Sequence, residues 1–111
     1  MSPIEYQTEI LDKLSRIMHM SAEAGYSKLS CRFDYSVSPD GSSSVGAQFF
    51  YVLDGKERSA ALVYPERKKL GDLVPELHRE MKGHTGGSWT GFTLVVDEKG
   101  TVKAYFEYPD E

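Results

Sequence analysis

The sequence has little that supports covalent cross-linking or a metal centre. A single cysteine, Cys31, excludes an internal disulfide and fits a reducing compartment. The histidines His19, His78 and His84 show no paired metal-ligand spacing, and one cysteine adds too few ligands for a zinc site. We therefore expect neither a metal nor a cofactor.

Long apolar runs are also missing, and we expect no signal peptide. The apolar stretches fall far short of the ~20 residues that a membrane-spanning helix needs. Residues 1–5 include an acidic side chain and lack both the basic and the apolar region of a signal peptide. These absences predict a cytoplasmic protein with no membrane partner.

Basic residues are outnumbered by acidic ones. The chain has 13 Lys and Arg against 17 Asp and Glu, a formal net charge of -4. Nucleic-acid binding needs a concentrated basic surface, so this balance disfavours a direct nucleic-acid partner. A basic protein partner fits it better.

The composition that remains is that of a folded domain. Hydrophobic residues make up 40% and charged residues 27% of 111 residues, values typical of globular chains. This length supports one hydrophobic core and no second one. We expect a single domain spanning 1–111.

The first predicted helix follows a capping box. Ser2 is placed to accept hydrogen bonds at the N-cap, with Glu5 three residues later. Apolar residues then recur at helical spacing along one stripe. We expect this helix to end near Ala24, with Gly25 as the residue that follows it.

The second predicted helix lies between 66 and 82, where apolar residues recur at intervals of three and four. Pro75 interrupts the pattern. It is tolerated if the regular helix begins near Asp72, which places the proline in the first turn. Gly83 is the expected stop.

A three-stranded meander is predicted between the two helices. Residues 29–37 alternate apolar and polar side chains, as a half-buried antiparallel strand does. A second strand covers about 45–53, and Asp54-Gly55 predicts a two-residue type I′ turn into the third. Pro65 ends that strand, because proline cannot donate to a ladder.

A β-hairpin closes the chain. Residues 90–96 and 102–108 alternate, and a three-residue loop 98–100 places Phe92 opposite Phe106 with both apolar rows on one side. Gly100 supplies the left-handed conformation that this loop requires.

The order is therefore helix, three-stranded meander, helix, two-stranded hairpin. Antiparallel strands joined by short turns, with helices segregated against one face, make an α+β two-layer sandwich. We expect an antiparallel sheet of about five strands, with both helices on one face.

The sequence gives no support for an enzyme. Cys31 is interpreted as a small core residue. His78 is interpreted as part of the polar side of the second helix. Asp34 and Glu107 lie on outward strand faces, where carboxylates ordinarily maintain solubility. An enzyme that uses Cys31 or a histidine remains an alternative, which alkylation of the native protein tests.

The outward face of the sheet is less uniform than a plain solvent-facing surface. Alternation places four apolar or aromatic residues there, among charged ones: Phe50, Val52, Val95 and Tyr105. Aromatic residues rimmed by charges are typical of protein interfaces, although isolated exposed apolar residues are also ordinary on surfaces.

Several short motifs follow one another along the chain: Gly41-Ser42-Ser43-Ser44-Val45, Phe49-Phe50-Tyr51, Trp89-Thr90-Gly91-Phe92-Thr93-Leu94, Asp97, Gly100, Lys103 and Phe106-Glu107-Tyr108. In this order they resemble the YezG-like immunity or antitoxin family of bacterial polymorphic-toxin systems.

The resemblance implies a small cytosolic protein that binds and neutralises a cognate toxin domain, commonly a nuclease, without catalysis. The short segment before the second helix leaves open a neighbouring family, including the immunity proteins of contact-dependent growth inhibition. An adaptor or peptide-binding domain unrelated to toxins is the alternative, since a sheet edge supports strand addition. We expect a monomer or a weak dimer.

A nuclease carries basic residues where it grips phosphate, so an inhibitor benefits from complementary acidic charge and from aromatic anchors. The residues predicted to contact the toxin are Asp34, Phe50, Asp54, Glu57, Tyr105, Glu107 and Asp110.

Overall fold

The computed structural model describes residues 2–85 and 88–109. Its elements follow the order helix, three strands, helix, two strands, with one 3-10 turn before the second helix. They are α1 (Pro3–Ser21), β1 (Lys28–Val37), β2 (Ser43–Leu53), β3 (Lys56–Ala60), η1 (Glu66–Lys69), α2 (Leu70–Thr85), β4 (Gly91–Val96) and β5 (Val102–Glu107).

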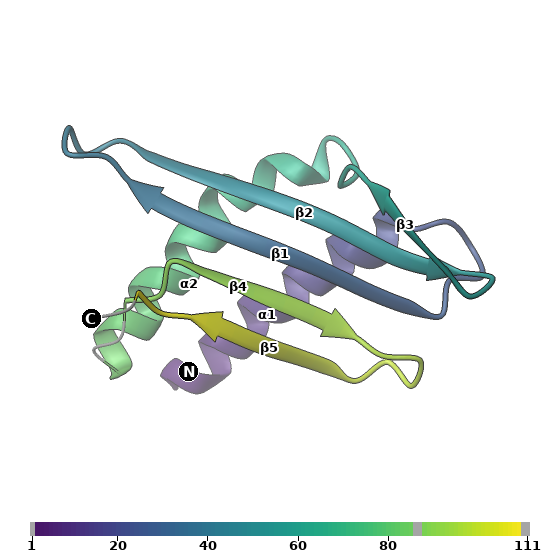
Figure 1. Ribbon diagram of the computed structural model, residues 1–111. Helices are drawn as coiled ribbons and strands as arrows, with labels where there is room; N and C mark the ends of the chain where they lie inside the picture. The colour runs from purple at the N-terminus through teal and green to yellow at the C-terminus, as the bar shows by residue number, and fades with distance from the viewer. Residues whose placement is uncertain (1, 86–87, 110–111) are drawn as a thin grey trace.

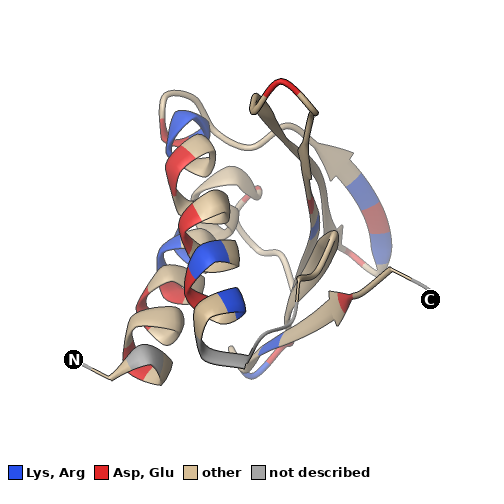
Figure 2. Cartoon of the chain, turned by 90° about the vertical axis from the view of Figure 1, so that its left-hand side faces the viewer, with Lys and Arg blue, Asp and Glu red and all other residues tan. Residues whose placement is uncertain are grey.

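The strands form one antiparallel sheet in the order β3-β2-β1-β4-β5 (Figure 1). β1 is the central strand. It pairs on one side with β2, which follows it after a short turn, and on the other side with β4, which follows α2 in the chain. Both helices cover the same face of the sheet, as Figure 2 shows. The predicted α+β two-layer architecture is confirmed.

The closing hairpin has the predicted register. Phe92 pairs with Phe106, and the loop is held by Asp97, whose Oδ1 accepts from the backbone N–H groups of Lys99 and Thr101 at 2.9 Å. Gly100 has φ +83°, which only glycine adopts without strain. Turn chemistry visible in the sequence therefore fixes which residues face the core.

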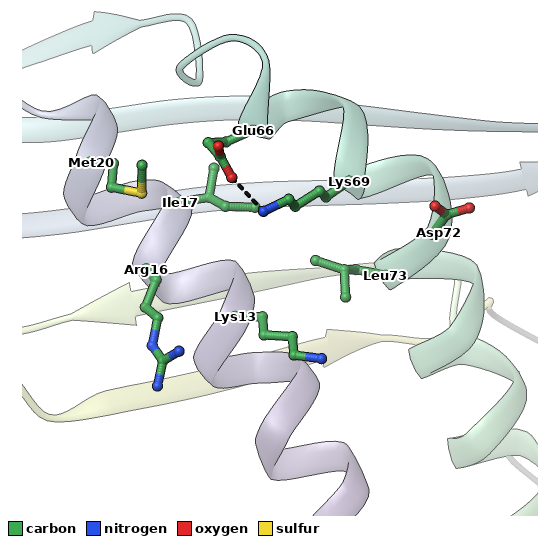
Figure 3. Close-up of a pocket in the computed structure, with 8 residues that line it drawn as sticks. All are labelled: Lys13, Arg16, Ile17, Met20, Glu66, Lys69, Asp72 and Leu73. Carbon is green, nitrogen blue, oxygen red and sulfur yellow. Dashed lines mark ion pairs between the residues drawn. The ribbon is translucent and has the colours of Figure 1, made fainter.

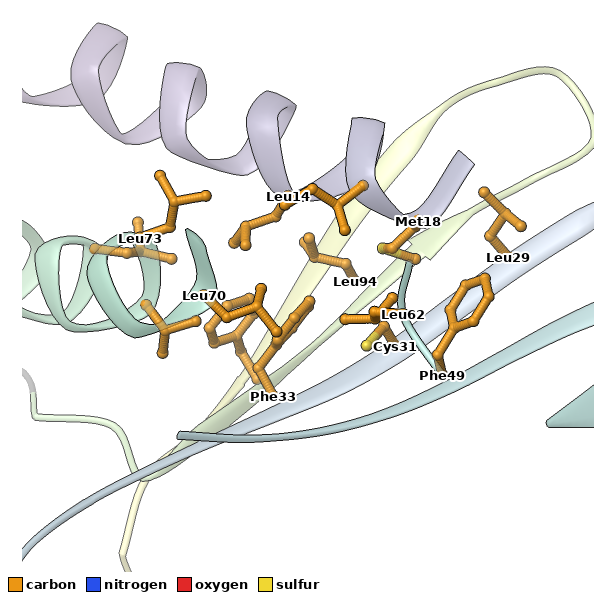
Figure 4. Close-up of a cluster of buried hydrophobic side chains, with 14 of the residues drawn as sticks. Leu14, Met18, Leu29, Cys31, Phe33, Phe49, Leu62, Leu70, Leu73 and Leu94 are labelled. Carbon is orange, nitrogen blue, oxygen red and sulfur yellow. The ribbon is translucent and has the colours of Figure 1, made fainter. Parts of the chain in front are cut away.

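The core lies between the helices and the sheet (Figure 4). Phe92 is fully buried, with its ring centroid 5.0 Å from that of Phe33 and 5.0 Å from that of Trp89. Leu14 and Met18 of α1 are fully buried as well. Burying large apolar side chains contributes about 1.5–3 kcal/mol each, so this layer accounts for much of the stability.

The first helix ends earlier than expected. α1 stops at Ser21 and not near Ala24, and Gly25, with φ +93°, lies in the turn that follows. The Ser21 hydroxyl donates to the Ile17 carbonyl at 2.6 Å and accepts from the Val63 N–H at 2.8 Å. The helix end is thus tied to a distant segment, which no local pattern reveals.

The third strand is also shorter than expected, because β3 ends at Ala60 and does not reach Pro65. Leu62 is 5% exposed and belongs to the core. Its burial, together with the bond from Val63 to Ser21, draws the chain away from the sheet. Within residues 2–85 and 88–109, no strand therefore pairs with the N-terminal half of β2 on that side.

The second helix begins before the predicted cap and passes the predicted stop. α2 starts at Leu70 and contains Pro75 beyond its first turn, so the Gly71 carbonyl lacks its usual amide donor. Gly83 lies inside the helix. Burial of Val74 and Leu77 on the core side outweighs these unfavourable residues.

Candidate binding face on the open side of the sheet

Among the described residues, no helix covers the second face of the sheet, since α1 and α2 both lie on the other side (Figure 2). We call this surface the outer face. Its side chains alternate with those of the core along every strand. They are Lys28, Ser30, Arg32, Asp34 and Ser36 of β1, Ser44, Gln48, Phe50 and Val52 of β2, Glu57 and Ser59 of β3, Thr93 and Val95 of β4, and Lys103, Tyr105 and Glu107 of β5.

Arg32 joins the two carboxylates that the sequence singled out. Its Nε and Nη2 donate to the two carboxylate oxygens of Glu107 at 3.0 and 3.2 Å, and its Nη1 lies 3.5 Å from Oδ2 of Asp34. The hydrogen bond to Glu107 raises the pKa of Arg32. Asp34 and Glu107, far apart in sequence, thus form one charged cluster.

Two glycines make room for this cluster. A Cβ at Gly91 would lie 3.1 Å from Nη2 of Arg32 and 2.9 Å from the Phe33 carbonyl oxygen. A Cβ at Gly46 would lie 2.6 Å from both carboxylate oxygens of Asp34. The charged side chains therefore lie flat over glycine backbone on the neighbouring strands.

A hollow lies toward the other end of the outer face. Across the sheet, Phe50, Ser30 and Val95 are direct neighbours on β2, β1 and β4. The serine is short and stands between two larger side chains, which leaves a depression of about 280 Å³. Val52 and Thr93 also line it. Phe50 is therefore one wall of this hollow, in addition to being apolar surface.

The other predicted contact residues are spread over the face. Glu57 lines the hollow, and Asp54 is exposed in the turn between β2 and β3 with φ +53°. Tyr105 is 56% exposed on β5. Asp110 lies outside the described residues.

The two predicted aromatic anchors do not form one cluster. Phe50 is on β2 and Tyr105 on β5, with β1 and β4 between them. At about 4.8 Å per strand spacing, they are ~14 Å apart along the sheet. A partner that contacts both must cover most of the outer face.

Charge on the outer face is balanced. The outer face carries three carboxylates, Asp34, Glu57 and Glu107, and an equal number of cations, Lys28, Arg32 and Lys103. Asp54, in the turn between β2 and β3, adds one negative charge beside this face. Long-range steering by this face is therefore weaker than the acidic composition suggested.

A histidine that the sequence placed on a polar helix side is in fact packed among aromatic rings. His78 lies 4.8 Å from Tyr35 and 4.7 Å from Trp89, centroid to centroid, and its Nε2 is 3.2 Å from the Ser88 hydroxyl. Desolvation lowers its pKa. Within residues 2–85 and 88–109, no carboxylate hydrogen-bonds this imidazole, so a nucleophile, base and orienting acid are not assembled.

Cys31 is fully buried on the inner side of β1, and desolvation raises the pKa of its thiol to about 12. A nucleophilic cysteine needs an accessible thiolate near neutral pH. The structure therefore supports the interpretation of Cys31 as a core residue.

The helix layer has a groove of its own, of about 430 Å³, between α1 and the start of α2 (Figure 3). Ile17 and Leu73 form apolar walls, and Lys69 pairs with Glu66 at 2.6 Å. Arg16 and Asp72 add opposite charges at the rim. Mixed charges over a short apolar floor do not identify a ligand class.

Across the described part of the chain, no group of three or more His, Cys, Asp or Glu side chains is placed to hold a metal ion. Among the same residues, no helix has the length and apolar character needed to cross a membrane.

Comparison with known proteins adds one partial likeness. No family model matches the chain. Over 80 residues it is 42% identical to a Stenotrophomonas maltophilia protein named "Chorionicgonadotropic hormone-like protein". The match covers 72% of this chain and 18% of that protein, so the chain spans less than a fifth of the length of this relative. A similar sequence thus occurs within a longer bacterial protein.

Proposed function

We propose that this protein is an immunity protein whose outer face binds a toxin domain, a nuclease by the family resemblance, and occludes it without catalysis. The observation that carries the proposal is the hollow formed by Phe50, Ser30 and Val95 on an uncovered sheet face. An apolar hollow with charged residues near its rim is the arrangement in which a few buried side chains supply most of the binding energy.

The charged cluster contributes specificity in this proposal. Arg32 and Glu107 are already paired, so a partner meets side chains whose positions are set before binding. Fixing side chains in advance reduces the entropy lost on association. The balanced charge of the face means that apolar contact at the hollow contributes more to affinity than steering does.

The test is co-purification with the C-terminal domain of a toxin encoded beside this gene, followed by measurement of Kd. Residue 30 points away from the core, so Ser30→Phe should fill the hollow and leave the fold intact. It should weaken binding by about 30-fold or more. Ser36→Phe makes the same change on the same strand and face, outside the hollow. It should bind like the parent.

Tyr105→Ala and Glu107→Lys extend the test across the face. The first removes an exposed aromatic side chain and should speed dissociation. The second turns an attraction to Arg32 into a repulsion and should also slow association. If these variants and Ser30→Phe bind and protect normally, while Arg16→Glu at the helix groove abolishes protection, the outer-face assignment is wrong.

A second candidate function is an adaptor domain unrelated to toxins. The observation in its favour is that the similar stretch in the Stenotrophomonas maltophilia protein accounts for 18% of a longer chain. A stretch of this size is large enough to fold as one domain of a longer chain. The absence of a toxin gene beside this one, together with failure to protect cells from related toxins, favours this candidate.

A further inference from the structure

In the described part of the chain, no strand pairs with one edge of β2 along about half of its length. β3 covers β2 only from Phe49 to Leu53, and its ladder ends with the pair of Phe49 and Ala60. The segment from Ser43 to Gln48 pairs with β1 on one side only. At about 3.4 Å per residue, this leaves ~20 Å of open strand edge.

The hydrogen-bonding groups on this edge can be assigned from the register. Leu53 and Lys56 flank a two-residue turn and are a hydrogen-bonded pair, so every second residue back along β2 points its N–H and C=O toward the β3 side. The bond from the Ser27 N–H to the Val52 carbonyl, at 2.9 Å, shows that the alternate residues face β1. Ser43, Val45 and Ala47 therefore direct backbone groups into the open position.

This segment also lacks the side chains that protect exposed edges. β3 and β5, the outermost strands, carry charged residues: Lys56, Glu57 and Arg58 on the first, Lys103 and Glu107 on the second. Charged side chains on an edge discourage pairing with another chain. No residue from Ser43 to Gln48 is charged. The open half of β2 is the edge that lacks this protection.

Side-chain space is available beside the open position. A hollow of about 450 Å³ lies against the inner side of this edge and is lined by Ser43, Val45, Ala47, Arg67, Leu70 and Gly71. The Arg67 guanidinium lies 5.9 Å from the Tyr64 ring centroid, and among the described residues it forms no ion pair with a carboxylate. An incoming strand would place alternate side chains into this hollow.

We propose that this edge binds an extended segment of a partner protein, which pairs antiparallel to β2 as a continuation of β3. Backbone hydrogen bonds to Ser43, Val45 and Ala47 hold the segment. Its inward side chains are apolar with one carboxylate, which pairs with Arg67. This contact is separate from the outer face and does not depend on what that face binds.

The probe is a blocked pentapeptide, valine-threonine-glutamate-threonine-valine, titrated to millimolar concentration into the isotopically labelled protein and followed by NMR. We expect saturable amide shifts confined to residues 43–48 and the neighbourhood of Arg67. The same peptide with a methyl group on the glutamate backbone nitrogen loses one donor to β2. It should bind at least about fivefold more weakly, the effect of one hydrogen bond.

Two protein variants complete the test. Ala47→Pro removes an N–H that is not part of the β1 ladder, and should abolish the shifts while leaving the fold intact. Ala47→Ser keeps that N–H and should bind like the parent. Arg67→Gln should weaken binding of the peptide that contains glutamate. It should not change binding of the peptide with glutamine in that position, which has no carboxylate to pair with Arg67. The proposal is overturned if the parent shows no shifts, if they map to the outer face, or if the methylated peptide binds equally.

Discussion

Arg32 on β1 binds Glu107 on β5 through two hydrogen bonds, although β4 lies between these strands. The guanidinium crosses β4 at Gly91, where the absence of a Cβ leaves its path free. A long side chain, a glycine and a carboxylate on three adjacent strands thus form one unit at one end of the outer face.

The two glycines of the outer face should respond differently to alanine. At Gly91 the added Cβ would meet the Phe33 carbonyl oxygen at 2.9 Å, which is backbone and cannot move freely. At Gly46 the three nearest atoms all belong to the Asp34 carboxylate, which can rotate away. We expect Gly91→Ala to cost about 1–3 kcal/mol of unfolding free energy and Gly46→Ala less. Equal losses in urea denaturation would show that the contact with Phe33 is unimportant.

The ion pair itself should contribute little to stability. The side chains of Arg32 and Glu107 are 40% and 47% exposed, and solvent screens a pair at such a position. A double-mutant cycle with Arg32→Gln and Glu107→Gln should give a coupling below about 1 kcal/mol, smaller still in high salt. A larger and salt-insensitive coupling would indicate that the pair is effectively buried.

Three phenylalanines should give a graded series on truncation. Phe92→Ala removes a fully buried ring and should cost about 3–5 kcal/mol in chemical denaturation. Phe106→Ala affects a partly buried ring on the edge strand β5 and should cost less. Phe50→Ala, on the outer face, should cost least and reduce partner binding instead. The reverse order would mean that the core and outer faces are exchanged.

Cys31 should resist alkylation in the native protein. Its thiol is buried and its pKa is raised to about 12, so it lacks both access and a thiolate. Iodoacetamide at neutral pH should label it only after unfolding. Cys31→Ser combined with Ser36→Cys places an exposed thiol on the same strand and should react readily. Rapid labelling of the native parent would reopen the possibility of a reactive cysteine.

Acidification should destabilise the protein partly through His78. Desolvation lowers the pKa of His78 below its ordinary value of 6.5, although a backbone hydrogen bond with Trp89 opposes the shift. His78 therefore binds a proton more readily in the unfolded chain than in the folded one. The stability that neutral His78 contributes is fully present above pH 6.5 and is lost as the pH falls through the pKa of the folded state. His78→Gln should show a shallower loss of unfolding free energy on acidification. Parallel curves would contradict this role.

Much of the fold was predictable because local chemistry specifies it. The turns at Asp54-Gly55 and Gly100 fix the register of two hairpins, and alternation then assigns faces. The early end of α1 was not predictable, since Ser21 bonds to Val63 across the fold. That α2 contains Pro75 was not predictable either, because burial of core residues favours the helix there although local propensity opposes it.

The candidate site was predictable residue by residue but not as an arrangement. Alternation placed Phe50, Tyr105 and Glu107 on the outer face. The pairing of β1 with β4 crosses α2, and no local signal gives its register. The hollow at Ser30 depends on that register, and so does the bond from Arg32 to Glu107. A serine in an alternating strand gave no sign of this role.

The central position of β1 also constrains the time course of folding. β1 meets β2 across a short turn, whereas β4 reaches it only after the whole of α2 has been added. Contacts that close long loops form slowly. Until β4 docks, the stretch from Leu29 to Asp34, with three fully buried side chains in the finished fold, is an open strand edge. During synthesis on the ribosome, this unpaired edge is a site at which the chain can pair with another chain and aggregate.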